Sequence, residues 1–217
     1  MRYIQSYFTD RGTTRPTNQD GVLLAKAETD AGEVLLAAVC DGMGGHAMGE
    51  LASAHCIRKL DRWFSRSLPE IAARGGNMID AAASSLARLA EECNRELYEY
   101  GRRGGIGLGS TMTAFVFAGG RYGAVQVGDS RGIVIFKKNA LQITEDQSLV
   151  ADEARRGIIT AEEARRDRRR NVLLSASGSR RTCIRRCIRE MQRPARRICF
   201  ALTASGAGSA STTTCGI

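Results

Sequence analysis

The residues with the clearest chemical potential lie in the segment Val39-Cys-Asp-Gly-Met-Gly-Gly-His46. An apolar run leads into Asp41, and three of the four residues that follow it are glycine. Glycine lets the backbone turn tightly and approach another group closely. We therefore expect Asp41 to end a strand, with its carboxylate and the Gly42 carbonyl directed at a hard cation such as Mg²⁺ or Mn²⁺. The alternative is an ordinary strand–turn–helix junction in which Asp41 is a turn residue.

Other segments also place acidic, basic or hydroxyl residues beside an apolar run. Arg15 precedes Asp20 by five residues in the segment Thr9-Asp-Arg-Gly-Thr-Thr-Arg-Pro-Thr-Asn-Gln-Asp20. Three more segments follow downstream, in the order Gly109-Ser-Thr-Met-Thr113, Val127-Gly-Asp-Ser-Arg131 and Leu141-Gln-Ile-Thr-Glu-Asp-Gln-Ser148.

From about Arg2 to Leu174, these segments and their order resemble the PPM (PP2C-like) family of metal-dependent serine/threonine protein phosphatases, of the bacterial type. The resemblance implies an α+β fold, with a central antiparallel β-sandwich flanked by helix pairs in four αββα layers. It also implies Mn²⁺- or Mg²⁺-dependent hydrolysis of phosphoserine or phosphothreonine. In that chemistry two ions about 4 Å apart activate a water and offset charge on the phosphoryl oxygens. Phosphorylated proteins would be the substrates, in opposition to a serine/threonine kinase.

The resemblance also implies a role for individual residues. Asp41 and Arg15 would be catalytic, Asp41 by bridging the ions and Arg15 by holding the substrate phosphate, which suits a guanidinium fork. Gly42 would offer its carbonyl to the metal, Asp20 would hold the second ion, and Asp129 would bind an additional, weaker one. The residues also permit ordinary interpretations. Asp20 and Arg15 could be loop residues, and Asp129 could simply form a turn.

Apolar periodicity indicates the elements that position these residues. Consecutive short strands with tight turns favour antiparallel pairing, and Thr160 with Glu163 forms the pattern of a capping box. The expected strands are 2–8, 21–26, 33–40, 110–118, 121–128 and 131–137, and the expected helices are 47–64, 78–100, 146–156 and 160–167.

The last part of the chain differs in composition from the rest. Residues 176–217 contain eight arginines and one acid, a net charge of +7 out of +9 for the whole chain. No aspartate follows Asp167, although the resemblance implies two further metal-binding aspartates in the second half. We therefore expect an incomplete phosphatase domain at 1–175 and a basic, aberrant, disordered tail at 176–217. The family's C-terminal strands would be lost or replaced, one metal site compromised and the activity impaired.

A shifted reading frame is our hypothesis for this change. The segment Ile198-Cys-Phe-Ala-Leu-Thr-Ala-Ser205 can be written in codons whose shifted frame reads Leu-Leu-Cys-Ala-Asp-Gly-Phe, an apolar-Asp-Gly sequence of the missing kind. A frameshift near Ser175–Gly178 that ended the chain early would account for the tail. A genuine basic extension is the alternative.

Three classes of function follow from these observations. The first is the active phosphatase, and the second is a catalytically inactive derivative that lacks the late aspartates. The third is a nucleic-acid binder that uses the arginine-rich tail for phosphate contacts. The tail interleaves no aromatic residue beyond Phe200 and contains no known binding module, so we expect no nucleic-acid partner.

Composition sets the remaining expectations. The chain is 43% hydrophobic and 25% charged, which is ordinary for one soluble globular domain. No apolar run reaches the roughly 18 residues needed to span a bilayer, and the N-terminus lacks the features of a signal peptide. Cys40, Cys56 and Cys93 have no ligand spacing and should be buried free thiols. We expect a cytoplasmic monomer that does not associate with membranes.

Overall fold

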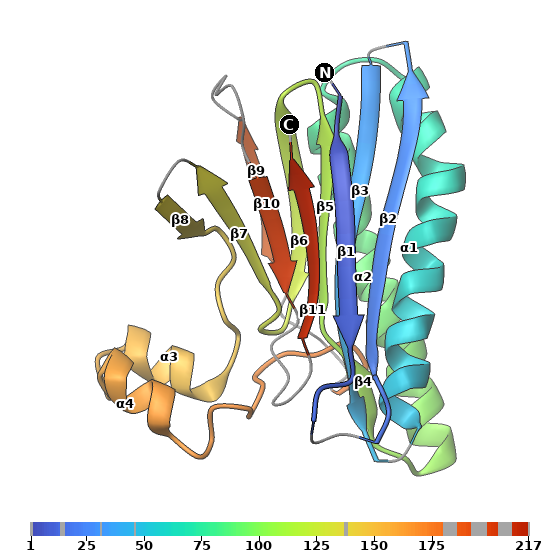
Figure 1. Cartoon of the computed structure of the whole chain (residues 1–217). Helices are drawn as coiled ribbons and strands as arrows, with labels where there is room; N and C mark the ends of the chain where they lie inside the picture. The colour runs from blue at the N-terminus through green and yellow to red at the C-terminus, as the bar shows by residue number, and fades with distance from the viewer. Residues whose placement is uncertain are drawn as a thin grey trace.

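The protein is a sandwich of two β-sheets in which the described strands pair in antiparallel fashion (Figure 1). The computed structural model describes residues 2–13, 16–30, 32–45, 47–136, 139–179, 186–191, 199–203 and 210–216. The six-stranded sheet contains, in order, β2 (Asp20–Thr29), β3 (Gly32–Gly44), β5 (Met112–Ala118), β6 (Arg121–Val127) and β9 (Arg186–Met191), with β4 (Leu108–Ser110) paired to β3. The five-stranded sheet contains β1 (Ile4–Asp10), β11 (Ala210–Gly216), β10 (Cys199–Thr203), β7 (Arg131–Phe136) and β8 (Asn139–Gln142).

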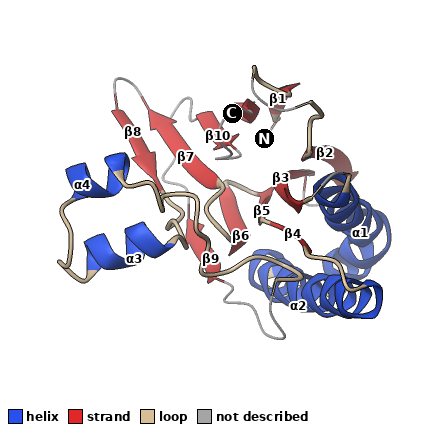
Figure 2. Ribbon diagram, turned by 90° about the horizontal axis from the view of Figure 1, so that it is seen from below, coloured by secondary structure: helices blue, strands red, loops and turns tan. Residues whose placement is uncertain are grey.

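Two long helices, α1 (Met48–Ala73) and α2 (Met78–Gly104), cover the outer face of the six-stranded sheet. Figure 2 shows them on one side of the molecule, and the short helices α3 (Leu149–Arg155) and α4 (Ala161–Arg166) on the far side, beside β7 and β8. The sandwich with flanking helices confirms the predicted α+β class. The predicted fourth layer differs, because within the described ranges a long helix pair covers only the six-stranded sheet.

Strand β3 lies at the centre of the core, and this position accounts for the unbroken apolar sequence of the strand. Val34, Leu36, Ala38 and Cys40 pack against the two long helices, whereas Leu35, Ala37 and Val39 belong to the second core between the sheets. A strand that is buried on both faces needs apolar residues at every position, not at alternate ones. Asp41 follows this run as predicted, but the strand continues past its predicted end at residue 40 as far as Gly44, so Asp41 lies inside it.

Helix α1 continues beyond its predicted end at residue 64 and passes through Pro69. A proline inside a helix removes one hydrogen bond and costs about 3 kcal/mol. Leu68 and Ile71, which flank Pro69, are both buried against the core. Burial of such side chains contributes about 1.5–3 kcal/mol each, which offsets the cost of the proline. At α4 the capping box of Thr160 and Glu163 is present as predicted.

The tail is the largest departure from the sequence prediction. Residues 176–217 were expected to be disordered, but β9, β10 and β11 lie within this range and pair with β6, β7 and β1. The backbone edge of a strand offers N–H and C=O groups to any neighbouring strand, whatever its side chains. The β-branched residues Thr212–Thr214 also favour extended structure. Strands are therefore present at these three segments, although their sequence is unlike the one that the family resemblance implies.

Three thiols meet where β3 contacts the two long helices. Cys40, Cys56 and Cys93 are buried and free, as the sequence predicted. Hydrogen bonding among the thiols and burial raise the pKa of Cys56 and of Cys93 above the usual range. Cys56 and Cys93 are therefore protonated packing groups of the core and poor nucleophiles. No helix in the described part of the chain is both long enough and apolar enough to cross a bilayer.

Candidate metal site

The pairing of β2 with β3 places Asp20 directly opposite Asp41. Residues opposite each other in an antiparallel pair have their Cβ atoms about 4.5–5.5 Å apart and project to the same face. Two like charges in this arrangement destabilise a sheet. A divalent cation held between the carboxylates would offset that repulsion. This register therefore favours the metal-binding interpretation of both aspartates over the loop and turn alternatives.

The strand alternation determines where the two carboxylates point. On β3, Leu35, Ala37 and Val39 face the other sheet, and on β2, Val22 and Leu24 pack against the same core. Because side chains alternate with a period of two, Asp41 and Asp20 continue these two rows. Both carboxylates therefore lie at the end of the space between the sheets. Asp41 is only 7% exposed there.

Gly42 lies where β2, β3 and α1 converge, and no larger residue fits there. A Cβ on Gly42 would lie 1.9 Å from the Gly49 carbonyl oxygen in the first turn of α1 and 2.7 Å from the Gln19 carbonyl oxygen. The Gly42 amide donates to that Gln19 oxygen at 3.1 Å. The oxygen atoms that a Cβ on Gly42 would meet are both backbone carbonyl oxygens, so the position next to Asp41 accepts only glycine.

A buried hydroxyl network fixes the backbone of Asp41. Its amide donates to Thr111 Oγ1 at 2.8 Å, and its carbonyl accepts from the Thr111 amide at 2.9 Å. Thr111 Oγ1 in turn shares a hydrogen bond of 2.7 Å with Ser130 Oγ. The Ser110 hydroxyl also reaches the Asp41 carbonyl, at 3.2 Å. Residues 109–113 form one of the motifs in the sequence, but no role was predicted for these hydroxyls. The structure shows that they position Asp41.

Asp129 lies in the turn between β6 and β7, next to Ser130 of this network. Asp129 therefore forms part of a turn, and it also lies beside the hydroxyl network that holds Asp41. The Gly128 amide donates to Gln147 Oε1 at 2.8 Å, so the segment 141–148 supports the turn. Asp129 also lines a cavity of about 300 Å³ that extends toward α3 and α4.

Arg131, which follows this turn, is held by Asp146. Its Nε lies 3.0 Å from both carboxylate oxygens of Asp146. The hydrogen bonds to Asp146 raise the pKa of Arg131 above its already high value. This guanidinium is therefore a fixed part of the turn. Arg15, the arginine predicted to hold the substrate phosphate, lies outside the described residues.

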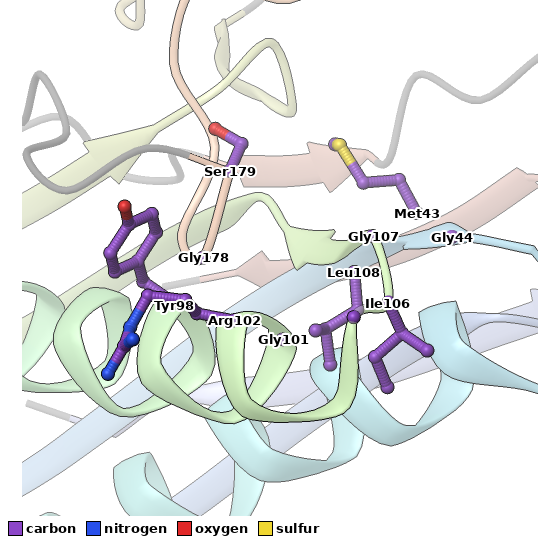
Figure 3. Close-up of a pocket in the computed structure, with 11 residues that line it drawn as sticks. Met43, Gly44, Tyr98, Gly101, Arg102, Ile106, Gly107, Leu108, Gly178 and Ser179 are labelled. Carbon is purple, nitrogen blue, oxygen red and sulfur yellow. The ribbon is translucent and has the colours of Figure 1, made fainter.

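A larger cavity of about 600 Å³ opens beside the end of β3 (Figure 3). Met43 and Gly44 line it from β3, directly after Gly42 along the chain. Tyr98 and Arg102 line it from α2, and Ser179 closes another side. The cavity thus lies beside the end of the strand that carries Asp41 and Gly42, against a largely apolar wall.

The structure accordingly assembles part of the predicted site. It brings Asp20, Asp41 and Gly42 together and connects Asp129 to them through Ser130 and Thr111. Among the described residues no group of three or more His, Cys, Asp or Glu side chains is arranged to hold a metal ion. The acidic residues that the structure places face to face are the pair Asp20 and Asp41.

We expect Thr111→Val to weaken this assembly without changing the shape of the side chain. The change removes the hydroxyl that serves both the Asp41 amide and Ser130, and a buried polar group left unpaired costs about 1–3 kcal/mol. Urea unfolding should show this loss, and Mn²⁺ affinity should fall several-fold. Thr29→Val is the matched control, because its hydroxyl bonds only the Gly32 carbonyl at the far end of β2. Equal losses in both variants would contradict the role of Thr111.

Comparison with known proteins places these features in a family context. Residues 13–180 match the family described as Protein phosphatase 2C. The chain is 36% identical over 175 residues to the serine/threonine protein phosphatase PstP of Mycobacterium tuberculosis, covering 77% of this chain and 30% of that protein. It is 33% identical to the serine/threonine phosphatase stp of Listeria monocytogenes, covering 78% of this chain and 65% of that protein. The chain thus spans less than two thirds of the length of either relative.

The fold is also that of a solved structure. The catalytic domain of the phosphatase PstP, crystallised with two manganese ions, superposes with a TM-score of 0.76 at 24% identity. The superposition covers 98% of this chain and 97% of that chain.

Proposed function

Because the chain belongs to the protein phosphatase 2C family, we propose that it is a metal-dependent phosphatase that hydrolyses phosphoserine and phosphothreonine in proteins. The pairing of Asp20 with Asp41 on one face of the sheet is the observation that supports this most directly. Hydroxyls that hold the Asp41 backbone and a glycine that admits no side chain are what a preorganised ion site needs.

Each residue has a defined part in this proposal. Asp41 and Asp20 supply carboxylate oxygens to Mn²⁺ or Mg²⁺, and Gly42 supplies its carbonyl. When bound, such an ion lowers the pKa of a water so that it can attack phosphorus, and it offsets charge on the phosphoryl oxygens. Thr111 and Ser130 keep Asp41 in position, Asp129 offers a carboxylate from the neighbouring turn, and Arg15 orients the phosphate as a guanidinium fork.

The proposed substrates are phosphorylated proteins that a serine/threonine kinase modifies, and the protein acts as a cytoplasmic monomer. The cavity beside Met43 and Tyr98 is large enough for side chains that flank the phosphorylated residue. Free buried thiols at Cys40, Cys56 and Cys93 agree with a reducing compartment.

This chain should catalyse the reaction slowly. No aspartate follows Asp167, and the family match ends at residue 180, close to the change in composition at 176. With fewer carboxylates the second ion is held weakly, because the affinity of oxygen sites follows their charge. We retain the frameshift near Ser175–Gly178 as the proposed origin of the altered sequence, which the coding DNA can test. A catalytically inactive derivative is the second candidate function, and the lack of any aspartate after Asp167 favours it.

Phosphate release from a phosphothreonine peptide, measured with Mn²⁺ and again after its removal by EDTA, tests the proposal. We expect slow release that depends on Mn²⁺. Calorimetric titration with Mn²⁺ should show at most one weak site. Mn²⁺ binding without any turnover would instead support the inactive derivative. A rate of phosphate release that is the same with and without Mn²⁺ would overturn the metal mechanism.

A further inference from the structure

A second polar cavity lies between α1 and α2, away from the candidate metal site. Its volume is about 370 Å³. Arg62, Arg66 and Ser67 line it from α1, and Ser85 and Arg88 line it from α2. Because α1 begins at Met48 and rises about 1.5 Å per residue, Arg62 and Arg66 lie about 21–27 Å along the helix from that end. The cavity is therefore distinct from the cleft at the end of β3.

Two side-chain contacts fix how the helices meet around this cavity. Lys59 Nζ lies 2.7 Å from Glu92 Oε1, and the Trp63 indole donates to Ser85 Oγ at 2.9 Å. The lining positions recur every three or four residues along each helix, so they form two facing stripes. The three arginines are thereby directed to one place by a rigid, antiparallel helix pair.

The charges around the cavity do not cancel. Lys59 is neutralised by Glu92 and by Glu96, which lies 2.9 Å away. No ion pair in the described part of the chain involves Arg62, Arg66 or Arg88. Other helix arginines do have acidic partners, as Arg103 has in Glu99. Three exposed guanidinium groups around one cavity, without acidic partners in the described part of the chain, create a positive potential that attracts an anion.

We propose that this cavity binds a phosphoryl dianion, either as free orthophosphate or as a phosphate ester carried by a protein. The guanidinium groups of Arg62, Arg66 and Arg88 offer planar pairs of N–H donors that match phosphate oxygens. Ser85 Oγ accepts a hydrogen bond from the Trp63 indole N–H, so the Ser85 O–H is available to donate to the ligand. Ser67 adds a second hydroxyl to the same wall. The site is independent of the two aspartates and of any bound metal.

The only tryptophan of the chain, Trp63, reports on this site directly. We would titrate the whole protein with orthophosphate at constant ionic strength, in EDTA so that metal-bound phosphate does not contribute. The expected result is a saturable change in Trp63 fluorescence, with a matching heat in calorimetry. A phosphothreonine peptide in place of orthophosphate identifies the source: tighter binding assigns the site to a phosphoprotein, and equal binding assigns it to free phosphate.

Two variants make the test specific. The double substitution Arg66→Gln and Arg88→Gln should weaken phosphate binding at least tenfold. Arg58→Gln is the matched control, because Arg58 is also exposed on α1 but lines a different cavity, and it should bind phosphate normally. The proposal is overturned if neither fluorescence nor heat saturates. It is likewise overturned if chloride gives the same response, or if the double variant binds like the wild type. None of these readings depends on phosphatase activity.

Discussion

Asp41→Asn is expected to lower Mn²⁺-dependent phosphate release about a thousandfold, equivalent to about 4 kcal/mol of transition-state stabilisation. Asparagine keeps the size of the side chain and leaves the backbone bonds to Thr111 intact. What it removes is the carboxylate charge at the position where Asp20 and Asp41 face each other. A neutral amide binds a hard cation weakly, so the attacking water loses most of its activation.

Because we expect this chain to turn over slowly, a second readout is necessary. Mn²⁺ that binds only the folded state raises the melting temperature, and this shift should be absent in Asp41→Asn. Asp61→Asn, an exposed position on α1, should keep both the activity and the shift. Asp20→Asn should give an intermediate loss of both. If Asp41→Asn keeps the wild-type rate and the wild-type Mn²⁺ shift, Asp41 does not hold the ion.

Gly42→Ala should be the most destabilising small change at the site. The added methyl would lie 1.9 Å from the Gly49 carbonyl oxygen and 2.4 Å from its carbon, both of which belong to the backbone of α1. Backbone atoms cannot rotate aside as a side chain would, so the end of β3 and the start of α1 must separate. Overpacking of this kind typically costs about 1–3 kcal/mol, and we expect about 3 kcal/mol here. Mn²⁺ affinity should fall with it, because the displaced strand carries Asp41.

Gly45→Ala provides the comparison for this prediction. Gly45 lies three residues further along, and a Cβ there would meet no heavy atom within 4 Å. Its backbone is also not among those with positive φ, so alanine is tolerated. Thermal unfolding of both variants should show a fall of about 6–12 °C for Gly42→Ala and little change for Gly45→Ala. If Gly42→Ala has the same melting temperature as the wild type, the end of β3 and the start of α1 separate at a lower cost in free energy than their geometry indicates.

Much of the architecture could be predicted because it is encoded in local patterns. The apolar run before Asp41 indicated a strand, and β3 is present there, buried on both faces. Helical spacing located α1 and α2, and the Thr160 capping box located the start of α4. Each of these signals depends on neighbours a few residues apart. Where burial of distant partners decided the outcome, as at Pro69, the predicted end of α1 was wrong.

The sequence by itself determined the types of the candidate site residues and their places at strand ends and turns. Only the tertiary structure decided that Asp20 is opposite Asp41, because that depends on the register of β2 with β3. The same holds for Thr111, which reaches Asp41 from 70 residues away, and for the arginines that α1 and α2 bring to one cavity. The tail strands β9, β10 and β11 were missed for a related reason. Pairing to a sheet edge depends on backbone groups that every residue carries, so the side-chain pattern of the tail alone did not indicate it.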